Sequence, residues 1–368
     1  METKPPLTIR RAVCRAMFVF DAGREVDLAA CRALAKEFVR PVPVTDSRCA
    51  PSSVRIESPP LRLDVPFDGF VLDGRRIDGP AEIAVYEFGA IAVTLCVPAG
   101  TTLGEMRDAA CALTGDAELA AAARSISNGL LARIGASVVD LRLADVVEEH
   151  LVFEITDFDS DVPLPDLPRH CGPELARILR AESQDLSAQE IEHATATRVM
   201  RTPDDLVLLD WNAAIVLDAE PEEARAVIEL ANVQLLEMRF LDRRLDESLH
   251  HAYDVVSRRV LWRPVLLPGG LREAMRHIAQ RQVDSAMLFE HVSNALKLVG
   301  DQYLARVYRG AAQQFELQAW NDAIVRKIAT LDSIYEKVHD RTVNARGEML
   351  EWIVILLILF EVVMQFWR

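Results

Sequence analysis

The first part of the chain alternates short apolar runs with amphipathic segments. Residues 12–20 form an apolar run that ends at Asp21, just before a glycine, and this pattern predicts a strand entering a turn. Apolar residues then recur at helical spacing after Asp27, which can cap a helix. The β-branched and aromatic residues on both sides of Gly89 predict adjoining strands.

The residues from 101 to 136 are rich in alanine and leucine, and Thr102 and Asp116 are suited to cap two helices there. A further strand is expected over residues 146–157. The order strand, helix, strands, helices, strand predicts an α+β domain over residues 1–160. We expect a ferredoxin-like (split β-α-β) sandwich, with helices on one face of an antiparallel sheet.

Residues 161–220 are predicted to be linker helices and a β-hairpin. A proline-rich linker comes first, and helical stretches follow it. The hairpin is expected over residues 206–218, with its turn at Asp210 to Asn212.

From residue 221 to residue 345 the pattern is almost continuously helical, which predicts a long helical arm. Prolines and glycines between residues 264 and 270 divide it into two runs. The second run contains apolar residues at the 4-3-4-3 spacing of a coiled-coil seam, over two heptads only. These residues are Ile324, Ile328, Leu331, Tyr335 and Val338. The seam fits either an antiparallel hairpin within one chain or an interface between chains.

Residues 346–368 form the most apolar stretch and predict a hydrophobic C-terminal helix. The residues expected to contact a membrane are Trp352, Ile353, Val354, Ile355, Leu356, Leu357, Ile358, Leu359, Phe360 and Trp367. Glu351 and Glu361 are separated by roughly 14 Å of helix, which is short against a hydrocarbon core of about 30 Å. Three interpretations stay open: a span within an oligomer whose polar stripe faces inward, a soluble oligomerisation helix, or a helix lying at the membrane surface. Arginines just upstream favour a main body on the cytoplasmic side.

Composition narrows the classes of function. The formal net charge is −15, from 41 Lys plus Arg against 56 Asp plus Glu, and no segment supplies the basic surface that nucleic-acid binding needs. A direct, sequence-specific nucleic-acid partner is therefore not expected. The six cysteines are scattered and follow no secretory signal peptide, so they are expected to be reduced and buried.

Motifs for catalysis and metal binding are largely absent. The sequence has no Walker-type phosphate loop, no dinucleotide-binding glycine pattern, no nucleophile elbow and no His-Glu-x-x-His helix. Two Glu-x-x-His pairs, Glu190 with His193 and Glu247 with His250, are weak candidates for a di-metal site. That number of pairs is close to the chance expectation, so no cofactor is predicted.

Several stretches resemble the required-for-meiotic-nuclear-division family, which is also catalogued as a domain of unknown function. They are residues 86–93, 125–130 and 231–239, and the ending Leu-Glu-Trp-Ile-Val-Ile at 350–355 with Glu361. Eukaryotic members are mitochondrial inner-membrane proteins that support translation of organelle-encoded proteins, as oligomeric scaffolds near the ribosome. The resemblance implies no catalytic residue. Without a transit peptide, this chain resembles a bacterial member.

Together these features predict a membrane-associated homo-oligomeric scaffold or tether rather than an enzyme. Its oligomerisation residues would be the seam residues together with Glu351 and Glu361. It would lie at the bacterial inner membrane with its main body in the cytoplasm and a C-terminal anchor. Its partners would be other copies of itself, the membrane, and the ribosome or another protein. The alternative is an uncharacterised enzyme or metal-binding protein that uses the N-terminal domain or the Glu-x-x-His pairs.

Overall fold

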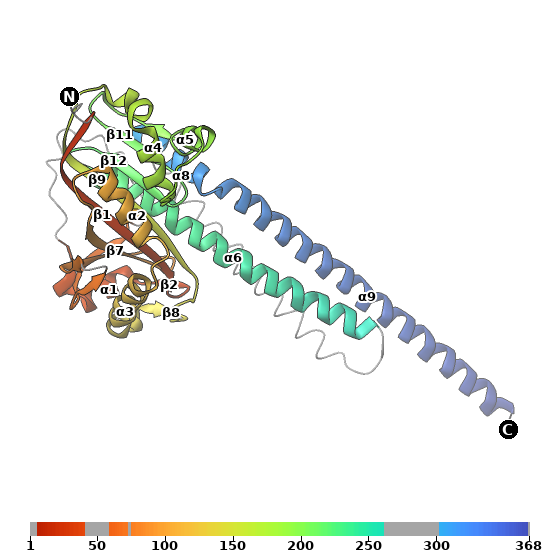
Figure 1. Ribbon diagram of the computed structural model, residues 1–368. Helices are drawn as coiled ribbons and strands as arrows, with labels where there is room; N and C mark the ends of the chain where they lie inside the picture. The colour runs from red at the N-terminus through yellow and green to blue at the C-terminus, as the bar shows by residue number, and fades with distance from the viewer. Residues whose placement is uncertain (1–5, 41–58, 73–74, 261–301, 367–368) are drawn as a thin grey trace. The chain divides into compact units, whose positions relative to one another are not determined.

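The computed structural model describes residues 6–40, 59–72, 75–260 and 302–366. The chain divides into two compact units (Figure 1). The first comprises residues 1–240 and 290–318 and is called the sheet unit; the second comprises residues 241–289 and 319–368 and is called the helical unit.

An eight-stranded sheet organises the sheet unit. Its strand order is β10-β11-β12-β9-β1-β7-β6-β3, and all neighbours are antiparallel except β12 and β9. The strands are β1 (Leu7–Asp21), β3 (Leu61–Pro66), β6 (Pro80–Val85), β7 (Ala90–Pro98), β9 (Val147–Ser160), β10 (Arg198–Val199), β11 (Leu206–Leu209) and β12 (Ala213–Leu217). Two small ribbons pair β2 (Glu25–Val26) with β8 (Val138–Val139) and β4 (Phe70–Leu72) with β5 (Arg75–Ile77).

Five α-helices belong to the part of the chain that packs on one face of the sheet, which we call the first face. Capping side chains explain where three of them begin. Asp27 accepts from two backbone amides, Thr102 forms a capping box with Glu105, and Asp116 accepts from Leu119 N. These three caps confirm the sequence prediction. The helices are α1 (Leu28–Leu34), α2 (Leu103–Leu113), α3 (Ala117–Ile134), α4 (Leu167–Arg180) and α5 (Ala188–Ala194), with short 3-10 turns η1 (Lys36–Phe38), η2 (Gly135–Ser137) and η3 (Leu164–Asp166).

Two further helices cover the second face of the sheet, which corrects the expectation that helices lie on one face only. The first part of α6 (Glu222–Val260) packs Leu230, Val233 and Leu236 on Val19 and Tyr86. The helix α8 (Gln302–Gln314) contacts β10 and β11. Because both faces are covered, residues 16–20 of β1 are all buried, and their sequence is an apolar run rather than an alternating pattern.

The hairpin of β11 and β12 belongs to the same sheet. The strand β12 pairs in parallel with β9, from Ala213 opposite Leu151 to Leu217 opposite Ile155, and all five of its residues are buried. The sheet therefore continues across the domain boundary expected at residue 160. The turn lies at Asp210 to Asn212, as the sequence predicts.

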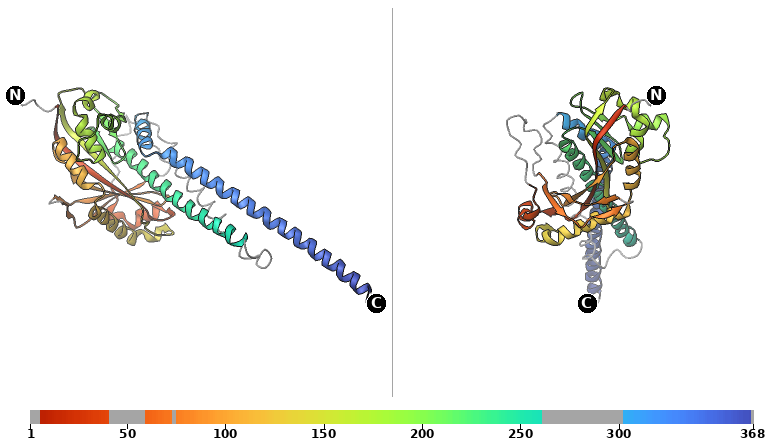
Figure 2. Two further views of the ribbon diagram at one scale, coloured as in Figure 1. Left: turned by 45° about the vertical axis from the view of Figure 1, so that its right-hand side comes forward. Right: turned by 60° about the vertical axis from the view of Figure 1, so that its left-hand side comes forward.

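The helical unit contains the second part of α6 and most of α9 (Leu317–Phe366). Within this unit the two helices lie side by side and run in the same direction, not as an antiparallel hairpin (Figures 1 and 2). Lys327 on α9 bridges Asp242 and Asp246 on α6 at 2.6 and 2.7 Å.

The described cysteines form no disulfide. Cys14, Cys31 and Cys171 are buried, whereas Cys96 and Cys111 are half-buried. Cys49 lies outside the described residues.

Candidate functional site

A ring of four charged side chains joins α6 to the second face of the sheet. Arg15 on β1 lies 2.8 Å from Glu82 on β6 and 2.9 Å from Glu154 on β9. Arg225 in the first turn of α6 contacts the same two carboxylates, at 2.9 and 3.1 Å. The Arg225–Glu154 contact is ionic rather than a well-directed hydrogen bond, since Glu154 Oε1 has no hydrogen-bond partner. Each arginine therefore holds both glutamates.

Further ion pairs extend this ring along the sheet. Arg40 lies 3.3 Å from Glu82 and donates to Asp64. Arg62 on β3 lies 2.8 Å from Glu229 on α6, which also accepts from the Tyr86 hydroxyl at 2.7 Å. We call these charged residues the sheet–helix network: Arg15, Arg40, Arg62, Arg225, Asp64, Glu82, Glu154 and Glu229.

Burial and neighbouring charges shift the pKa values of two residues at this network. Burial alone would raise the pKa of Glu82, but Arg225, Arg15 and Arg40 hold it below its usual value. Burial and the neighbouring Glu229 carboxylate raise the pKa of Tyr86 well above 10, so its hydroxyl stays protonated and donates. The network contains four arginines and four carboxylates.

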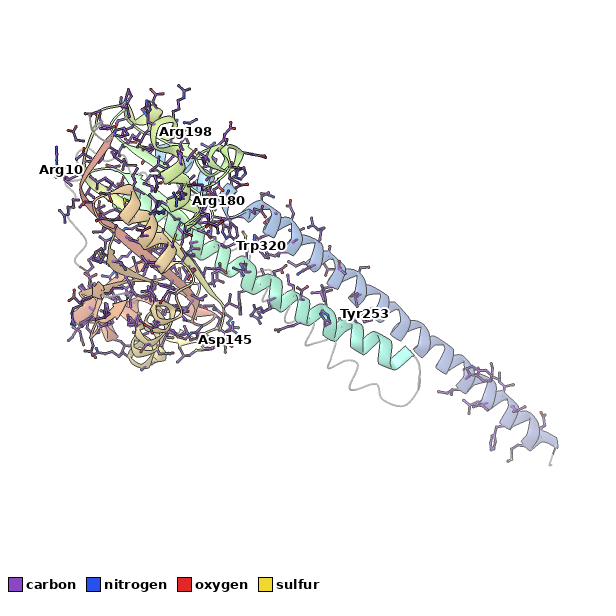
Figure 3. The ribbon with its side chains drawn as sticks, in the orientation of Figure 1. Arg10, Asp145, Arg180, Arg198, Tyr253 and Trp320 are labelled. Atoms are coloured by element: carbon purple, nitrogen blue, oxygen red, sulfur yellow. The ribbon has the colours of Figure 1, made fainter. Side chains whose placement is uncertain are left out.

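A second polar cluster surrounds Arg180 at the end of α4, labelled in Figure 3. Its guanidinium lies 2.6 Å from Asp210 in the β11–β12 turn, in an ionic contact. It also lies 2.9 Å from His193 Nδ1 and 3.7 Å from Glu190, both on α5. The candidate pair Glu190 and His193 is thus brought to Asp210, but the cation at its centre is an arginine.

His150 on β9 was missed by sequence reasoning. Its imidazole is buried, its Nδ1 lies 3.2 Å from Trp211 O, and its Nε2 has no hydrogen-bond partner. Phe315 packs edge-on against the ring, with centroids 5.1 Å apart. Burial lowers the pKa of His150 to about 4, so the ring is neutral at physiological pH. The sequence around it offers no motif, because its partners come from distant segments.

The metal candidates do not assemble into a site. His250 Nδ1 lies 2.8 Å from the Asp246 carbonyl of its own helix. Among the side chains that the structure describes, no group of three or more His, Cys, Asp or Glu residues is arranged to hold a metal ion.

The predicted oligomerisation residues behave differently along α9. Ile324 and Leu331 are buried and Ile328 is half-buried, so the upstream part of the seam is used within the chain. The side chains of Tyr335, Val338, Glu351 and Glu361, and all of Trp367, lie outside the described residues.

A nine-residue segment of α9 exposes an unbroken run of apolar side chains. Every residue from Trp352 to Phe360 is apolar and 41–64% exposed. Nine residues make two and a half turns, so the exposed apolar surface encircles the helix. We call residues 352–360 the apolar girdle.

The sequence leaves open whether the helix over residues 346–368 spans a membrane. In the part of the chain that the structure describes, no helix combines the length and apolar character needed to cross a bilayer.

Comparisons with known proteins match the N-terminal part of the chain. A sequence model of the family described as "Uncharacterized protein MJ0711, N-terminal domain" matches residues 11–223, from β1 to the start of α6. The "Uncharacterized protein MJ0711" of Methanocaldococcus jannaschii is 24% identical over 192 residues. The alignment covers 52% of this chain and 58% of that relative's length. No solved structure matches the chain.

Proposed function

The chain belongs to the family of the MJ0711 N-terminal domain, and from this premise we propose that it is a homo-oligomeric scaffold assembled through α9. The observation that carries the proposal is the apolar girdle. An uninterrupted apolar surface of this kind on a helix is costly in water and marks an interaction site. The occupant we infer is the same segment of other copies.

The geometry of the girdle supports a bundle over a simple pair. One neighbouring helix covers only one side, whereas the exposed residues point in every direction. A bundle of several copies buries the inward sides of all its helices at once. The girdle, from residue 352 to residue 360, is roughly 14 Å long, which suits a neighbour of the same length better than a bilayer core of about 30 Å.

Membrane association is part of the proposal. In such a bundle the outward sides of the girdle stay apolar, and they would contact the apolar part of a membrane surface. The flanking Glu351 and Glu361 would then mark the two ends of the contact. We propose that the protein lies at the bacterial inner membrane, with its main body in the cytoplasm.

The resemblance to the required-for-meiotic-nuclear-division family gives the proposal its cellular setting. Two of the resembling stretches pack together: Tyr86, Ala90 and Ala92 contact Val233 and Leu236. A buried cluster built from both stretches is what a core shared with that family requires. From the resemblance itself we infer a role in translation or membrane-protein biogenesis beside a ribosome or another protein partner. The central strands β9-β1-β7-β6 are all antiparallel, which supports a ferredoxin-like core within the larger sheet.

The test is the mass of the full chain by light scattering, with and without detergent, against a chain ended at Gly347. The full chain should be oligomeric and the shortened chain monomeric. Leu357→Asp should also dissociate the assembly, since it places a charge in the girdle. Thr330→Asp, at an exposed position of the same helix, is the matched control and should leave the mass unchanged.

A monomeric full chain under both conditions contradicts the scaffold. Flotation with vesicles of phosphatidylglycerol and phosphatidylethanolamine tests the membrane part separately. If the protein is oligomeric but does not float with the vesicles, the proposed assembly stands and the proposed membrane contact is wrong.

A further inference from the structure

Glu237 has a buried carboxyl group that the sheet–helix network does not neutralise. It lies in the part of α6 that belongs to the sheet unit, and only 2% of its surface is exposed. Its Oε1 atom is buried without a hydrogen-bond partner. A carboxylate in this position would be costly, because burial removes the water that stabilises its charge.

A second buried acid and one arginine act on this carboxyl. Asp21, at the end of β1, is also 2% exposed and accepts from Arg142 Nη2 at 3.0 Å. Arg142 lies in the loop of residues 140–144, which we call the latch loop. Its guanidinium also stacks over the Phe240 ring of α6, at 4.7 Å from the centroid. Arg142 thus pairs with Asp21 and touches the helix that carries Glu237.

The latch loop is fastened to the same end of β1 by its backbone. Arg142 N donates to Ala22 O at 3.0 Å, and Ala144 N donates to Asp21 O at 2.8 Å. The strand end, the latch loop and α6 therefore meet at Arg142. A change of charge here would act on all three elements.

Other charged groups on the neighbouring elements have partners of their own. Arg124 on α3 donates to Ala144 O of the latch loop at 2.8 Å, and Arg24 lies 3.6 Å from Asp140. Two residues beyond Glu237 on α6, Arg239 lies 2.6 Å from Glu148 on β9. Tyr86, next to β6, donates to Glu229. Burial first, and then the negative charge of Asp21, raise the pKa of Glu237 well above its usual value, and Arg142 only partly opposes this.

We propose that Glu237 carries a proton at neutral pH, and that loss of this proton releases the latch loop from α6. While Glu237 is protonated, Asp21 balances the charge of Arg142. After deprotonation two buried carboxylates share that single guanidinium, and the contact opens so that water reaches the second charge. The inference is independent of the proposed assembly, because its residues all lie in the sheet unit.

Amide hydrogen exchange of the full-length protein tests the proposal between pH 6 and pH 10, after correction for the intrinsic pH dependence of exchange. Protection of the latch loop and of residues 236–240 should fall about tenfold for each pH unit between the ordinary pKa of a solvated glutamate and the raised pKa of Glu237, since one proton is released on opening in that range. Above the raised pKa the fall should level off. Protection that stays flat in the wild type overturns the proposal without any variant.

Glu237→Gln assigns the effect to this carboxyl, because the amide resembles the protonated acid and cannot ionise. Its protection should be independent of pH. Glu229→Gln is the matched control on the same helix, and it should keep the wild-type pH dependence. If Glu237→Gln fails to fold, Asp21→Asn is the second test. Without the Asp21 charge, an ionised Glu237 would pair with Arg142. The loss of protection at high pH should then disappear. A pH dependence that persists in the variant that folds overturns the assignment.

Discussion

Arg225 in the first turn of α6 lies 3.1 Å from Glu154 on the central strand β9. Its guanidinium also reaches Glu82 on β6, which is three strands away from β9 in the sheet. A single helical residue therefore ties together two strands that do not pair with each other. This contact places α6 across the second face of the sheet, and Leu230 and Val233 complete the attachment with apolar contacts.

Removing the side chain of Arg225 should be strongly destabilising. In Arg225→Ala, Glu82 keeps Arg15 and Arg40, but Glu154 keeps Arg15 alone. Breaking a buried ion pair from one side costs about 3–5 kcal/mol, so we expect a loss of about 3 kcal/mol in the free energy of unfolding. Chemical denaturation measures it.

The matched control for Arg225 is Arg10→Ala. Arg10 pairs with Asp157 at 3.1 Å, but both side chains are more than half exposed. An exposed pair contributes about 0–1 kcal/mol, so this variant should stay close to the wild type. Equal losses in the two variants would mean that the sheet–helix network does not hold α6.

The buried imidazole of His150 should make the folded protein less stable below neutral pH. Its folded-state pKa of about 4 lies below the ordinary value of 6.5, so the unfolded chain binds the proton more readily between these values. The free energy of unfolding should therefore fall as the pH drops from about 6.5 towards about 4. The contribution of this one group is about 3 kcal/mol over that range, at about 1.4 kcal/mol per pKa unit.

The measurement is a series of denaturation curves between pH 4 and pH 7 for the wild type and His150→Leu. The variant should show a shallower decline, since no buried imidazole has to be charged. His170→Leu provides the control, because His170 is exposed on α4. If His150→Leu and His170→Leu have the same pH dependence, the buried imidazole is not the group that titrates.

Gly89 should not tolerate alanine. Its φ is +101°, and a Cβ atom there would lie 1.9 Å from the Gly23 carbonyl oxygen. The same turn is held by Ala22 N, which donates to Gly89 O at 2.9 Å. Gly89→Ala should cost more than about 3 kcal/mol, because a backbone clash adds to the conformational cost of about 1–2 kcal/mol.

Gly79→Ala separates these two costs for Gly89. Gly79 has a similar φ of +104° but open space around its Cα. The free energy of unfolding of Gly79→Ala should therefore fall by the conformational cost only. The difference between the two midpoints of chemical denaturation measures the clash, and a difference of zero would contradict the close approach of Gly23.

The sequence predicts those features that depend on neighbouring residues. The caps at Asp27, Thr102 and Asp116 are local, since each side chain bonds to amides within the next three residues. The turn between β11 and β12 is local as well. The α+β class follows from such elements together.

The features that were missed depend on partners far apart in the chain. Arg225, Glu229 and Glu237 have the polar character of an exposed helix face, yet all three are buried. The partners of Arg225 and Glu229 include Glu82 and Arg62, which are 143 and 167 residues away in sequence and which nothing in the sequence marks as partners. The parallel pairing of β12 with β9 is equally non-local. For this reason the second covered face and the sheet–helix network could not be predicted.

Leu331 tests whether the two helices of the helical unit depend on each other. It is 1% exposed on α9, one helical turn beyond Lys327, which bridges Asp242 and Asp246 of α6. Leu331→Asp should cost about 3 kcal/mol or more in that unit, because a buried apolar side chain is lost and a carboxylate takes its place. Thr330→Asp places the same charge one residue earlier, at an exposed position, and should have little effect. Hydrogen exchange should accelerate in α9 and in residues 241–252 for Leu331→Asp alone, while the strands of the sheet unit keep their protection. If both variants exchange alike, α9 does not rely on α6, and the burial of Leu331 has no energetic role in holding the helices together.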